Sequence, residues 1–369
     1  MTKAMQKMSM GRGKPIAAAD FTRRPAGQVE DLSGQKRLIR RNGASGTLLR
    51  VAVTIAVVML LGCGSSSDTP SQLGAQPSDW MKAISDYASI SGLSIPGTHD
   101  SGTYTQDQTA GAGYVKTQMW SIYDQLNILG IRFLDIRCRL IGNGFAIHHG
   151  SVYLGLDFQE VINQCRSFLS AHPNETILMD VGHEYEDQNS TLSFHQVFLN
   201  YYNSNRYLDG RDLWYTGTTI PTLGQVRGKI VLMRSFDLDP GTDAIGINIA
   251  TGGGNSAYSW NQFSTNPDQT VYVESLWTPD SSPGDAYDVK WDAIQQNIWR
   301  AKSGASPDHL YMTWTSATMP GWHTPLDFAQ NINPRLKNFP AGSGPMGIVI
   351  MDFPGDDTIG FIIDSDFVR

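Results

Sequence analysis

The 369-residue sequence predicts an α/β fold built as a single (β/α) barrel, and three observations carry that prediction. From about Ser78 onward, short runs rich in β-branched or aromatic residues recur, mostly bounded by Gly, Pro, Asp or Ser, as strands are. Amphipathic segments of helical length lie between several of these runs. A content of 40% hydrophobic and 10% aromatic residues supplies a sizeable core.

Strands and helices are expected to alternate along the domain. The expected strands are residues 90–95, 133–140, 145–148, 177–181, 230–234, 271–275, 311–316 and 347–353. The expected helices are residues 114–129, 158–170, 192–203, 291–302 and 325–338. This alternation fits a barrel that is irregular where the linkers are long and polar, as at residues 239–269.

Charge is distributed unevenly along the chain. Residues 1–63 hold 11 of the 28 Lys and Arg residues but only 3 of the 35 Asp and Glu residues. The remainder has 17 basic and 32 acidic residues, a net charge of −15. Such a domain repels phosphates at long range, so an anionic substrate must be held by a few local cations or by apolar insertion. This argues against nucleic acid as a partner.

The basic N-terminus leads into an apolar run, residues 51–61, that is too short to span a bilayer but fits a secretory signal. The sequence Leu-Leu-Gly-Cys at residues 60–63 resembles the lipobox of bacterial lipoproteins, in which Cys63 is lipidated after cleavage. The alternative is an ordinary signal with an incidental cysteine. Residues 64–70 fit a flexible tether.

These features predict three parts. Residues 1–62 are the basic N-terminus and lipoprotein signal peptide, residues 63–77 the lipidated cysteine and tether, and residues 78–369 the barrel domain. The protein is therefore expected to cross the inner membrane and to remain anchored in the cell envelope, or to be extracellular.

Polar residues of catalytic type cluster at or near the carboxyl ends of the expected strands, where chemistry gathers in such barrels. They are His99, Arg137, His149, Arg234 and Asp352. Asp100 adjoins His99 in a turn rich in Gly and Ser. A base, an acid and a fixed positive charge are what phosphodiester cleavage needs when no metal performs the chemistry.

Three assignments leave alternatives open at this point. Side chains alternate along a strand, so only one of two adjacent histidines faces the barrel; His149, nearer the strand end, is chosen and His148 is read as structural. Asp135 and Arg137 share a face, as an internal ion pair, as pocket groups, or as both. The cysteines that follow the signal region, Cys138 and Cys165, form a disulfide or remain buried thiols.

Several segments together resemble the bacterial phosphatidylinositol-specific phospholipases C, which have the X catalytic domain. The segments are residues 94–103, 131–137, 148–154, 173–179 and 228–232, in the family's order. The resemblance extends from about residue 80 to the C-terminus and implies a distorted TIM barrel. It also implies an enzyme that cleaves phosphatidylinositol to diacylglycerol and a cyclic inositol phosphate. The expected partner is a phospholipid bilayer, met by a monomer.

The resemblance also implies a division of labour among the catalytic residues. His99 matches the general base that takes the proton of the inositol 2-hydroxyl, and Asp352 matches the carboxylate that orients it. His149 matches the general acid for the leaving diacylglycerol oxygen, with Asp100 as its acidic partner. Arg137 matches the cation on the phosphate oxygens. His99 and Asp100, although adjacent, would then serve different halves of the proton transfer.

Headgroup recognition is where the sequence departs from the family. Where bacterial relatives carry a lysine, this chain has Gly182, so glycosylated headgroups or a related lipid join phosphatidylinositol as candidate substrates. The expected substrate contacts are Glu184, Arg234, Glu274 and Trp277. The register at Glu274 is open by one residue, and an end-of-strand ion pair is the alternative for Arg234.

Two tryptophans, Trp120 and Trp322, resemble interfacial residues of the family, because an indole ring suits the bilayer boundary. The alternative is that both belong to the core.

The resemblance further implies that no metal or other cofactor is required. Eukaryotic relatives carry an acidic calcium ligand where this chain has Arg137, and a guanidinium repels a cation. Two alternatives remain. One is a metal-dependent phosphodiesterase of the glycerophosphodiester or sphingomyelinase type, and the other is a non-catalytic lipoprotein that binds lipid or glycan.

Overall fold

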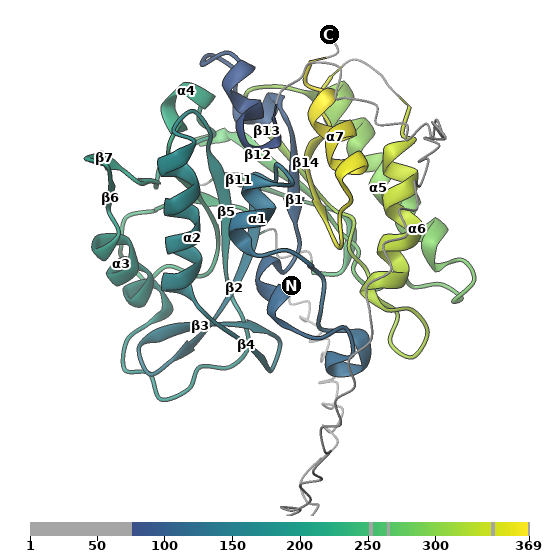
Figure 1. The fold of residues 1–369 in the computed structure, drawn as a ribbon, viewed down its shortest axis with the longest axis horizontal. Helices are drawn as coiled ribbons and strands as arrows, with labels where there is room; N and C mark the ends of the chain where they lie inside the picture. The colour runs from purple at the N-terminus through teal and green to yellow at the C-terminus, as the bar shows by residue number, and fades with distance from the viewer. Residues whose placement is uncertain (1–75, 251–253, 264–265, 341–343, 368–369) are drawn as a thin grey trace, which may run out of the picture. The chain divides into compact units, whose positions relative to one another are not determined.

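A mostly parallel sheet forms the centre of the domain in the computed structural model (Figure 1). The structure describes residues 76–250, 254–263, 266–340 and 344–367. Strands follow the order β10-β9-β5-β2-β1-β14-β13-β12-β11, and every neighbouring pair is parallel except β11 with β12. Within the described residues no ladder joins β10 to β11, so the barrel is open there. The α/β class and distorted barrel predicted from the sequence are confirmed.

Most strands of the barrel lie where the sequence predicts them, but two fall within residues 239–269, which were expected to be an irregular linker: the strands at 247–248 and 256–263. The path through the described residues contains nine strands. They are β1 (Ser94–Thr98), β2 (Phe133–Ile141), β5 (Ile177–His183), β9 (Ile230–Ser235), β10 (Ile247–Asn248), β11 (Ser256–Phe263), β12 (Asn266–Ser275), β13 (His309–Trp314) and β14 (Gly347–Met351). Outside this path lie β3 (Gly144–His149), β4 (Val152–Asp157), β6 (Tyr207–Leu208), β7 (Arg211–Asp212) and β8 (Trp214–Tyr215).

Helices pack on the outside of the sheet. Figure 1 shows α2 (Phe158–Ala171) and α3 (Phe194–Ser204) on the side of β2 and β5. On the side of β13 and β14 lie α5 (Ala286–Gly304), α6 (Pro325–Lys337) and α7 (Asp356–Asp364). Shorter helices are α1 (Ile122–Asn127) and α4 (Leu223–Val226), with 3-10 turns at Pro77–Ala83, Ile90–Gly92, Ser101–Thr105 and Ala110–Gly113. No described helix combines the length and the apolar character needed to cross a membrane.

Two expected barrel strands differ in the structure. Residues 90–92 form a 3-10 turn, so β1 starts only at Ser94 and runs to Thr98. The run at 145–148 becomes β3, which pairs antiparallel with β2 and β4 as a hairpin outside the barrel path. A two-residue connection after Ile141 permits only the antiparallel return, since a parallel crossover needs a dozen or more residues.

The expected helix at 114–129 is mostly wrong. Only Ile122–Asn127 is helical, and Ser121 caps it by accepting a hydrogen bond from the Asp124 amide at 3.2 Å. Before Ser121, backbone groups form hydrogen bonds with distant segments: the Thr117 carbonyl accepts from the Phe353 amide at 2.8 Å. Groups committed to such partners cannot form a helix ladder.

Close packing inside the barrel explains one glycine near the active site. A Cβ at Gly97 would lie 2.9 Å from Cβ of Phe133 and 3.3 Å from Cγ1 of Ile350. Phe133 in turn meets Trp314 edge to face, with ring centroids 6.3 Å apart. Only glycine fits this approach.

Buried thiols and a buried ion pair complete the core. Cys138 and Cys165 are free and buried, so of the two alternatives for the cysteines the unpaired one holds. At the amino end of β2, Arg132 pairs with Glu175 at 2.7 Å and donates to the carbonyls of Pro77 and Ser78. This ion pair therefore holds the segment at Pro77 and Ser78 against the amino-terminal end of the barrel. The catalytic candidates lie at the opposite, carboxyl-terminal end of the strands.

Candidate active site

Strand register decides which side chains enter the barrel. Asp135 aligns with Asp180, and Arg137 aligns with Gly182 and through it with Ser235. Because aligned residues of parallel strands point to the same face, this row lines the interior together with Phe133. The residues between them face the surrounding helices.

His99 and Asp352 meet because β1 and β14 are neighbours. Thr98 aligns with Met351, so the next residues of both strands emerge side by side on the inner face. His99 Nδ1 lies 2.7 Å from Asp352 Oδ1. Burial lowers the pKa of His99, but Asp352 and then Asp100 outweigh it and hold that pKa above its usual value. The carboxylate accepts from Nδ1–H, which leaves Nε2 to take a proton.

His149 stands at the end of β3, where the hairpin folds back over the barrel mouth. Its Nδ1 lies 2.8 Å from the Val115 carbonyl, which can only accept, so Nδ1 carries a proton and Nε2 faces the site. The His99 and His149 rings stand edge to face with centroids 6.4 Å apart. His148 is buried and contacts Tyr153 outside the site, as the structural interpretation predicts.

Asp100 and Arg137 occupy the centre between the histidines. Arg137 Nε lies 3.0 Å from Asp100 Oδ1, and Nη2 lies 3.1 Å from Asp135 Oδ2. Burial raises the pKa of Asp100, but Arg137, then His149 and His99, hold it below its usual value. Burial lowers the pKa of Arg137, yet Asp100, Asp135 and Glu184 hold it well above the usual range. Arg137 is thus both an ion-pair member and a pocket group.

The predicted separation of His99 from Asp100 needs correction. Asp100 Oδ2 lies 3.2 Å from Nε2 of His99 and 3.4 Å from Nε2 of His149. Asp100 has a left-handed backbone (φ 44°), which turns its carboxylate into the centre of the site. One carboxylate oxygen therefore faces both rings, instead of serving His149 alone.

The same carboxylates form a group with metal-ligand spacing. Ligand atoms of His99, Asp100 and Asp135 lie within 4.8 Å of one another. Arg137 already contacts both carboxylates, and a divalent cation placed there would meet a guanidinium. The residues present do not fit a metal ion.

Headgroup candidates next to Arg137 are arranged around Gly182. A Cβ at Gly182 would meet only Cβ of Ser235, at 3.9 Å, so the space that a longer side chain would fill is open. Asp180 lies two residues before Gly182 on the same face of β5. Burial, and after it the neighbouring Asp135 carboxylate, raise the pKa of Asp180 to about 8. Glu184 accepts from the Gly150 amide at 2.6 Å, which places this predicted contact at the rim beside His149.

Arg234 and Glu274 do not enter the barrel, contrary to prediction. Arg234 aligns with Val181, a residue of the outer face, and its guanidinium donates to the carbonyls of Ile245 and Phe236. Glu274 aligns with Thr313 on the outer face and pairs with Lys290 of α5 at 2.7 Å, both side chains being fully buried. The sequence left the register at Glu274 open by one residue. Because side chains alternate along a strand, the neighbouring Ser275 is the residue that points into the barrel.

The predicted aromatic contacts lie on the surface. Trp322 is 68% exposed, Trp120 is 44% exposed and Trp277 is 48% exposed. The alternative that Trp120 and Trp322 are core residues is therefore excluded. The loops that carry these two residues touch, since the Gly321 amide donates to Tyr114 Oη at 2.8 Å.

Sequence reasoning missed the residues that hold the catalytic backbone in place. Gln118 Nε2 donates to the His99 carbonyl at 2.8 Å and to the Met351 carbonyl at 2.9 Å. Thr117 Oγ1 donates to the same His99 carbonyl at 2.9 Å. Only the three-dimensional structure brings them there.

Asp180 was also missed, although the sequence carried a signal for it. It lies two residues before Gly182 and therefore on the same face of the strand.

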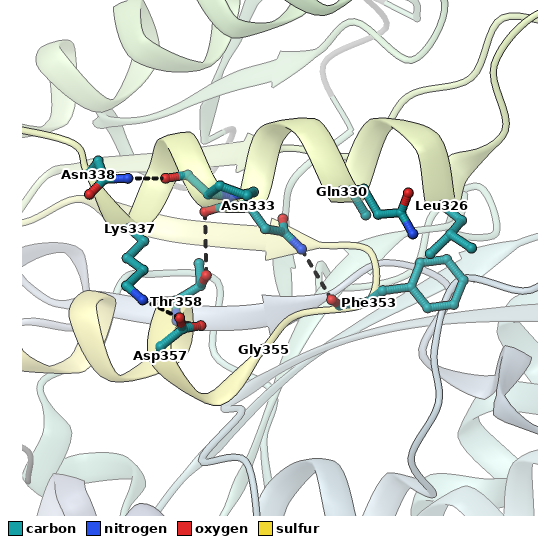
Figure 2. Close-up of a pocket in the computed structure, with 11 residues that line it drawn as sticks. Leu326, Gln330, Asn333, Lys337, Asn338, Phe353, Gly355, Asp357 and Thr358 are labelled. Atoms are coloured by element: carbon teal, nitrogen blue, oxygen red, sulfur yellow. Dashed lines mark hydrogen bonds and ion pairs between the residues drawn. The ribbon is translucent and has the colours of Figure 1, made fainter. Parts of the chain in front are cut away.

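A cavity of about 560 Å³ lies between α6 and α7 (Figure 2), and neither histidine is among its lining residues. Asn333, one of its lining residues, donates from Nδ2 to the carbonyls of Asp352 and Phe353 at 3.0 and 3.1 Å. The cavity therefore borders the outer, helix-covered side of β14, whereas the catalytic candidates lie on the inner side of the barrel.

Both histidines present a ring nitrogen to one space, and Arg137 supplies the fixed positive charge there. This arrangement can remove a proton on one side of a phosphate and deliver one on the other. Within a parallel barrel, these are the groups that an acid–base phosphodiesterase requires.

Comparisons with known proteins identify the family. The family model described as "Phosphatidylinositol-specific phospholipase C, X domain" matches residues 93–235. The chain is 31% identical over 333 residues to a 1-phosphatidylinositol phosphodiesterase of Staphylococcus aureus, covering 85% of this chain and 97% of the relative. It is also 31% identical over 297 residues to that of Listeria monocytogenes, covering 78% and 84%.

Solved structures give the same result. A phosphatidylinositol-specific phospholipase C from Staphylococcus aureus superposes with a TM-score of 0.70 at 29% identity, over 79% of this chain and 97% of that one. The Listeria monocytogenes enzyme superposes with a TM-score of 0.59 at 25% identity, over 79% and 99%. The chain belongs to the family of bacterial phosphatidylinositol-specific phospholipases C.

Proposed function

We propose that this chain cleaves phosphatidylinositol to diacylglycerol and inositol 1,2-cyclic phosphate by acid–base catalysis that needs no metal. The observation that carries the proposal is the placement of the two Nε2 atoms, 3.2 and 3.4 Å from one carboxylate oxygen beside Arg137. The Staphylococcus aureus and Listeria monocytogenes relatives are named 1-phosphatidylinositol phosphodiesterases, which supports the substrate and the phosphodiester bond of this proposal.

The reaction follows from the protonation of the two rings. Nε2 of His99 takes the proton of the inositol 2-hydroxyl as that oxygen bonds to phosphorus. The bond from phosphorus to the diacylglycerol oxygen breaks, and Nε2–H of protonated His149 gives that oxygen its proton. Asp352 and Asp100 stabilise the two imidazolium forms, and Arg137 neutralises the phosphate oxygens. The nucleophile is part of the substrate, so positioning removes much of the entropic barrier.

Phosphorus NMR tests the proposal. Phosphatidylinositol vesicles are incubated with the full chain, with and without excess chelator, beside sphingomyelin and glycerophosphodiesters. We expect the signal of a five-membered cyclic phosphodiester from phosphatidylinositol at equal rates in both conditions. Complete loss of activity in chelator would support a metal-dependent phosphodiesterase, and binding of lipid without any product would support a non-catalytic lipoprotein.

Headgroup choice belongs to the same proposal, with Glu184 at the rim as a contact and Gly182 as an open position. Trp277, exposed at the end of β12, is proposed as a further contact. Because a Cβ at Gly182 would meet only Ser235 Cβ within 4 Å, substituents on the inositol ring are expected to be tolerated. A panel of phosphatidylinositol and glycosylated forms measures this, and Gly182→Lys should narrow the preference toward the unsubstituted ring.

Trp120 and Trp322 are proposed as membrane contacts, and Cys63 as a lipid anchor. Exposed indoles would replace the electrostatic attraction that an acidic domain lacks. A solved Staphylococcus aureus relative was studied for modulation of its membrane binding. Cys63 lies outside the described residues, so its modification rests on the sequence. Labelling with a fatty acid, lost in Cys63→Ala, tests the anchor.

A further inference from the structure

Asp180 carries a buried carboxyl group of the barrel interior that the proposed reaction does not use. It lies on β5 in register with Asp135 of β2, and it is only 6% exposed. Its Oδ1 is buried and has no hydrogen-bond partner among the described residues. In such a place an ionised carboxylate is a buried charge with one oxygen unsatisfied. The uncharged acid leaves only a polar group unsatisfied, which is far less unfavourable.

The guanidinium that acts on Asp180 is already committed to two other carboxylates. Arg137 places Nε 3.0 Å from Asp100 Oδ1 and Nη2 3.1 Å from Asp135 Oδ2. Gly182, the next inward residue after Asp180 on β5, has no side chain and therefore brings no counter-charge. A third negative charge beside this guanidinium would thus be left largely uncompensated.

The groups packed against Asp180 favour its uncharged form. Burial, and after it the Asp135 carboxylate of β2, raise the pKa of Asp180 to about 8. The Ser235 hydroxyl of β9 and Arg137 of β2 act in the opposite direction but are outweighed. The Cys138 thiol of β2 stays protonated, because burial and then Asp180 raise its pKa well above the usual value. Asp180 is therefore uncharged at neutral pH and ionises just above it.

The charge of Asp180 bears on the side chain that meets the phosphate. Burial lowers the pKa of Arg137, yet three carboxylates hold it well above the usual range. They belong to Asp100, Asp135 and Glu184. Neighbouring strands lie only about 5 Å apart, so one more carboxylate on β5 would compete with the substrate phosphate for the same positive charge.

We propose that Asp180 serves the reaction as an uncharged acid, which leaves Arg137 free to neutralise the substrate phosphate, and that ionisation of Asp180 weakens this contact. The proposal rests on the proposed function and assigns Asp180 as a positioning residue that acts through Arg137. It gives the enzyme an upper pH limit that is separate from the protonation of His149.

The experiment first removes the other ionisation that limits the enzyme at high pH. His149 must be protonated to act as the acid, so it also produces an alkaline limb. A soluble inositol phosphodiester with a nitrophenol leaving group needs no such acid, because nitrophenolate departs as a stable anion. The full chain carrying His149→Ala is assayed with this substrate from about pH 6.5 to about pH 9.5. An alkaline limb should remain, with its midpoint near pH 8.

Asp180→Asn in this background should abolish the limb, because an amide does not ionise. An acid with a pKa of about 8 is about nine-tenths ionised one unit higher. The variant should therefore be about tenfold faster than its parent at about pH 9, since only a tenth of the parent then remains uncharged. A merely structural role would make the variant slower at every pH. Asp180→Ser, whose hydroxyl does not ionise either, keeps the test decisive if Asp180→Asn fails to fold.

Asp364 provides a matched control for Asp180. Burial raises the pKa of this carboxyl too, but it is the last residue of α7. The next residue, Ser365, contacts Ser94 at the amino end of β1, away from the strand ends that carry the catalytic residues. Asp364→Asn should leave the alkaline limb where it is.

Two results would overturn the proposal: absence of the limb in His149→Ala, or a limb that neither variant of Asp180 moves. Absence of cyclic product from any substrate is a different outcome, since it contradicts the proposed function. The protonation of Asp180 is then read from the carbon NMR resonance of its carboxyl group, identified by its loss in Asp180→Asn. A midpoint near pH 8 supports the uncharged acid, and one near the usual value for aspartate contradicts it.

Discussion

The two sides of the barrel mouth differ in how predicted residues reach the site. On the side of β1, β2 and β14, the predicted catalytic residues converge around Arg137, with separations of 2.7 to 3.4 Å. On the side of β9 and β12, Arg234 and Glu274 point into the outer layer. A sequence motif thus locates a residue along a strand to within about one position. A shift of one position, however, decides whether its side chain points into the barrel or toward the surrounding helices.

The largest expected effect tests the convergent side. His99→Ala should lower kcat/KM on phosphatidylinositol vesicles by about 10² to 10⁴, the usual contribution of a general base. Arg234→Lys, at the corresponding strand end on the other side, should change kcat/KM by less than about threefold, because its guanidinium binds loop carbonyls and the Phe236 ring outside the barrel interior. Equal losses in the two variants would remove the distinction.

A stability measurement tests the outer placement of Glu274. Glu274→Ala leaves the Lys290 ammonium buried without its carboxylate, which should lower the free energy of unfolding by about 3 to 5 kcal/mol. The double replacement Glu274→Leu with Lys290→Met should recover most of that loss, measured by denaturant unfolding. Activity per folded molecule should stay near the unaltered value, and a selective rise in KM would place Glu274 at the substrate instead.

A smaller effect tests how Asp352 acts on His99. The carboxylate holds the pKa of His99 above its usual value, and the base must be neutral to take a proton. Asp352→Asn removes the charge, so the pKa of His99 falls and the acid limb of the kcat/KM profile moves to lower pH. The maximum rate should fall about tenfold. An acid limb that moves to higher pH would show that Asp352 does not act by charge.

The sequence predicted the fold and the convergent side of the site because both depend on local pattern. Strand runs and turn residues located β1, β2, β5 and β14 to within a few residues. The turn around His99 and Asp100 was visible as a Gly- and Ser-rich cluster. Such features are encoded within a short stretch of chain.

What the sequence did not reveal depends on contacts between distant segments. Residues 114–121 look amphipathic, yet their backbone groups bond to His149 and Phe353, far away in the chain. The shared position of Asp100 requires the hairpin of β3 and β4 to pack against the 3-10 turn Ser101–Thr105, which follows β1. The outer placement of Glu274 depends on Lys290 in α5, which no pattern in β12 announces.

The assignment of base and acid to His99 and His149 is tested most directly by the leaving group. In a substrate with nitrophenol in place of diacylglycerol, the leaving group departs as a stable nitrophenolate anion and needs no proton. Attack by the inositol 2-hydroxyl still needs a base. With this substrate, His149→Ala should recover to within about tenfold of the unaltered enzyme, and His99→Ala should remain about 10² to 10⁴ slower. Equal impairment of both variants on both substrates would contradict the assignment.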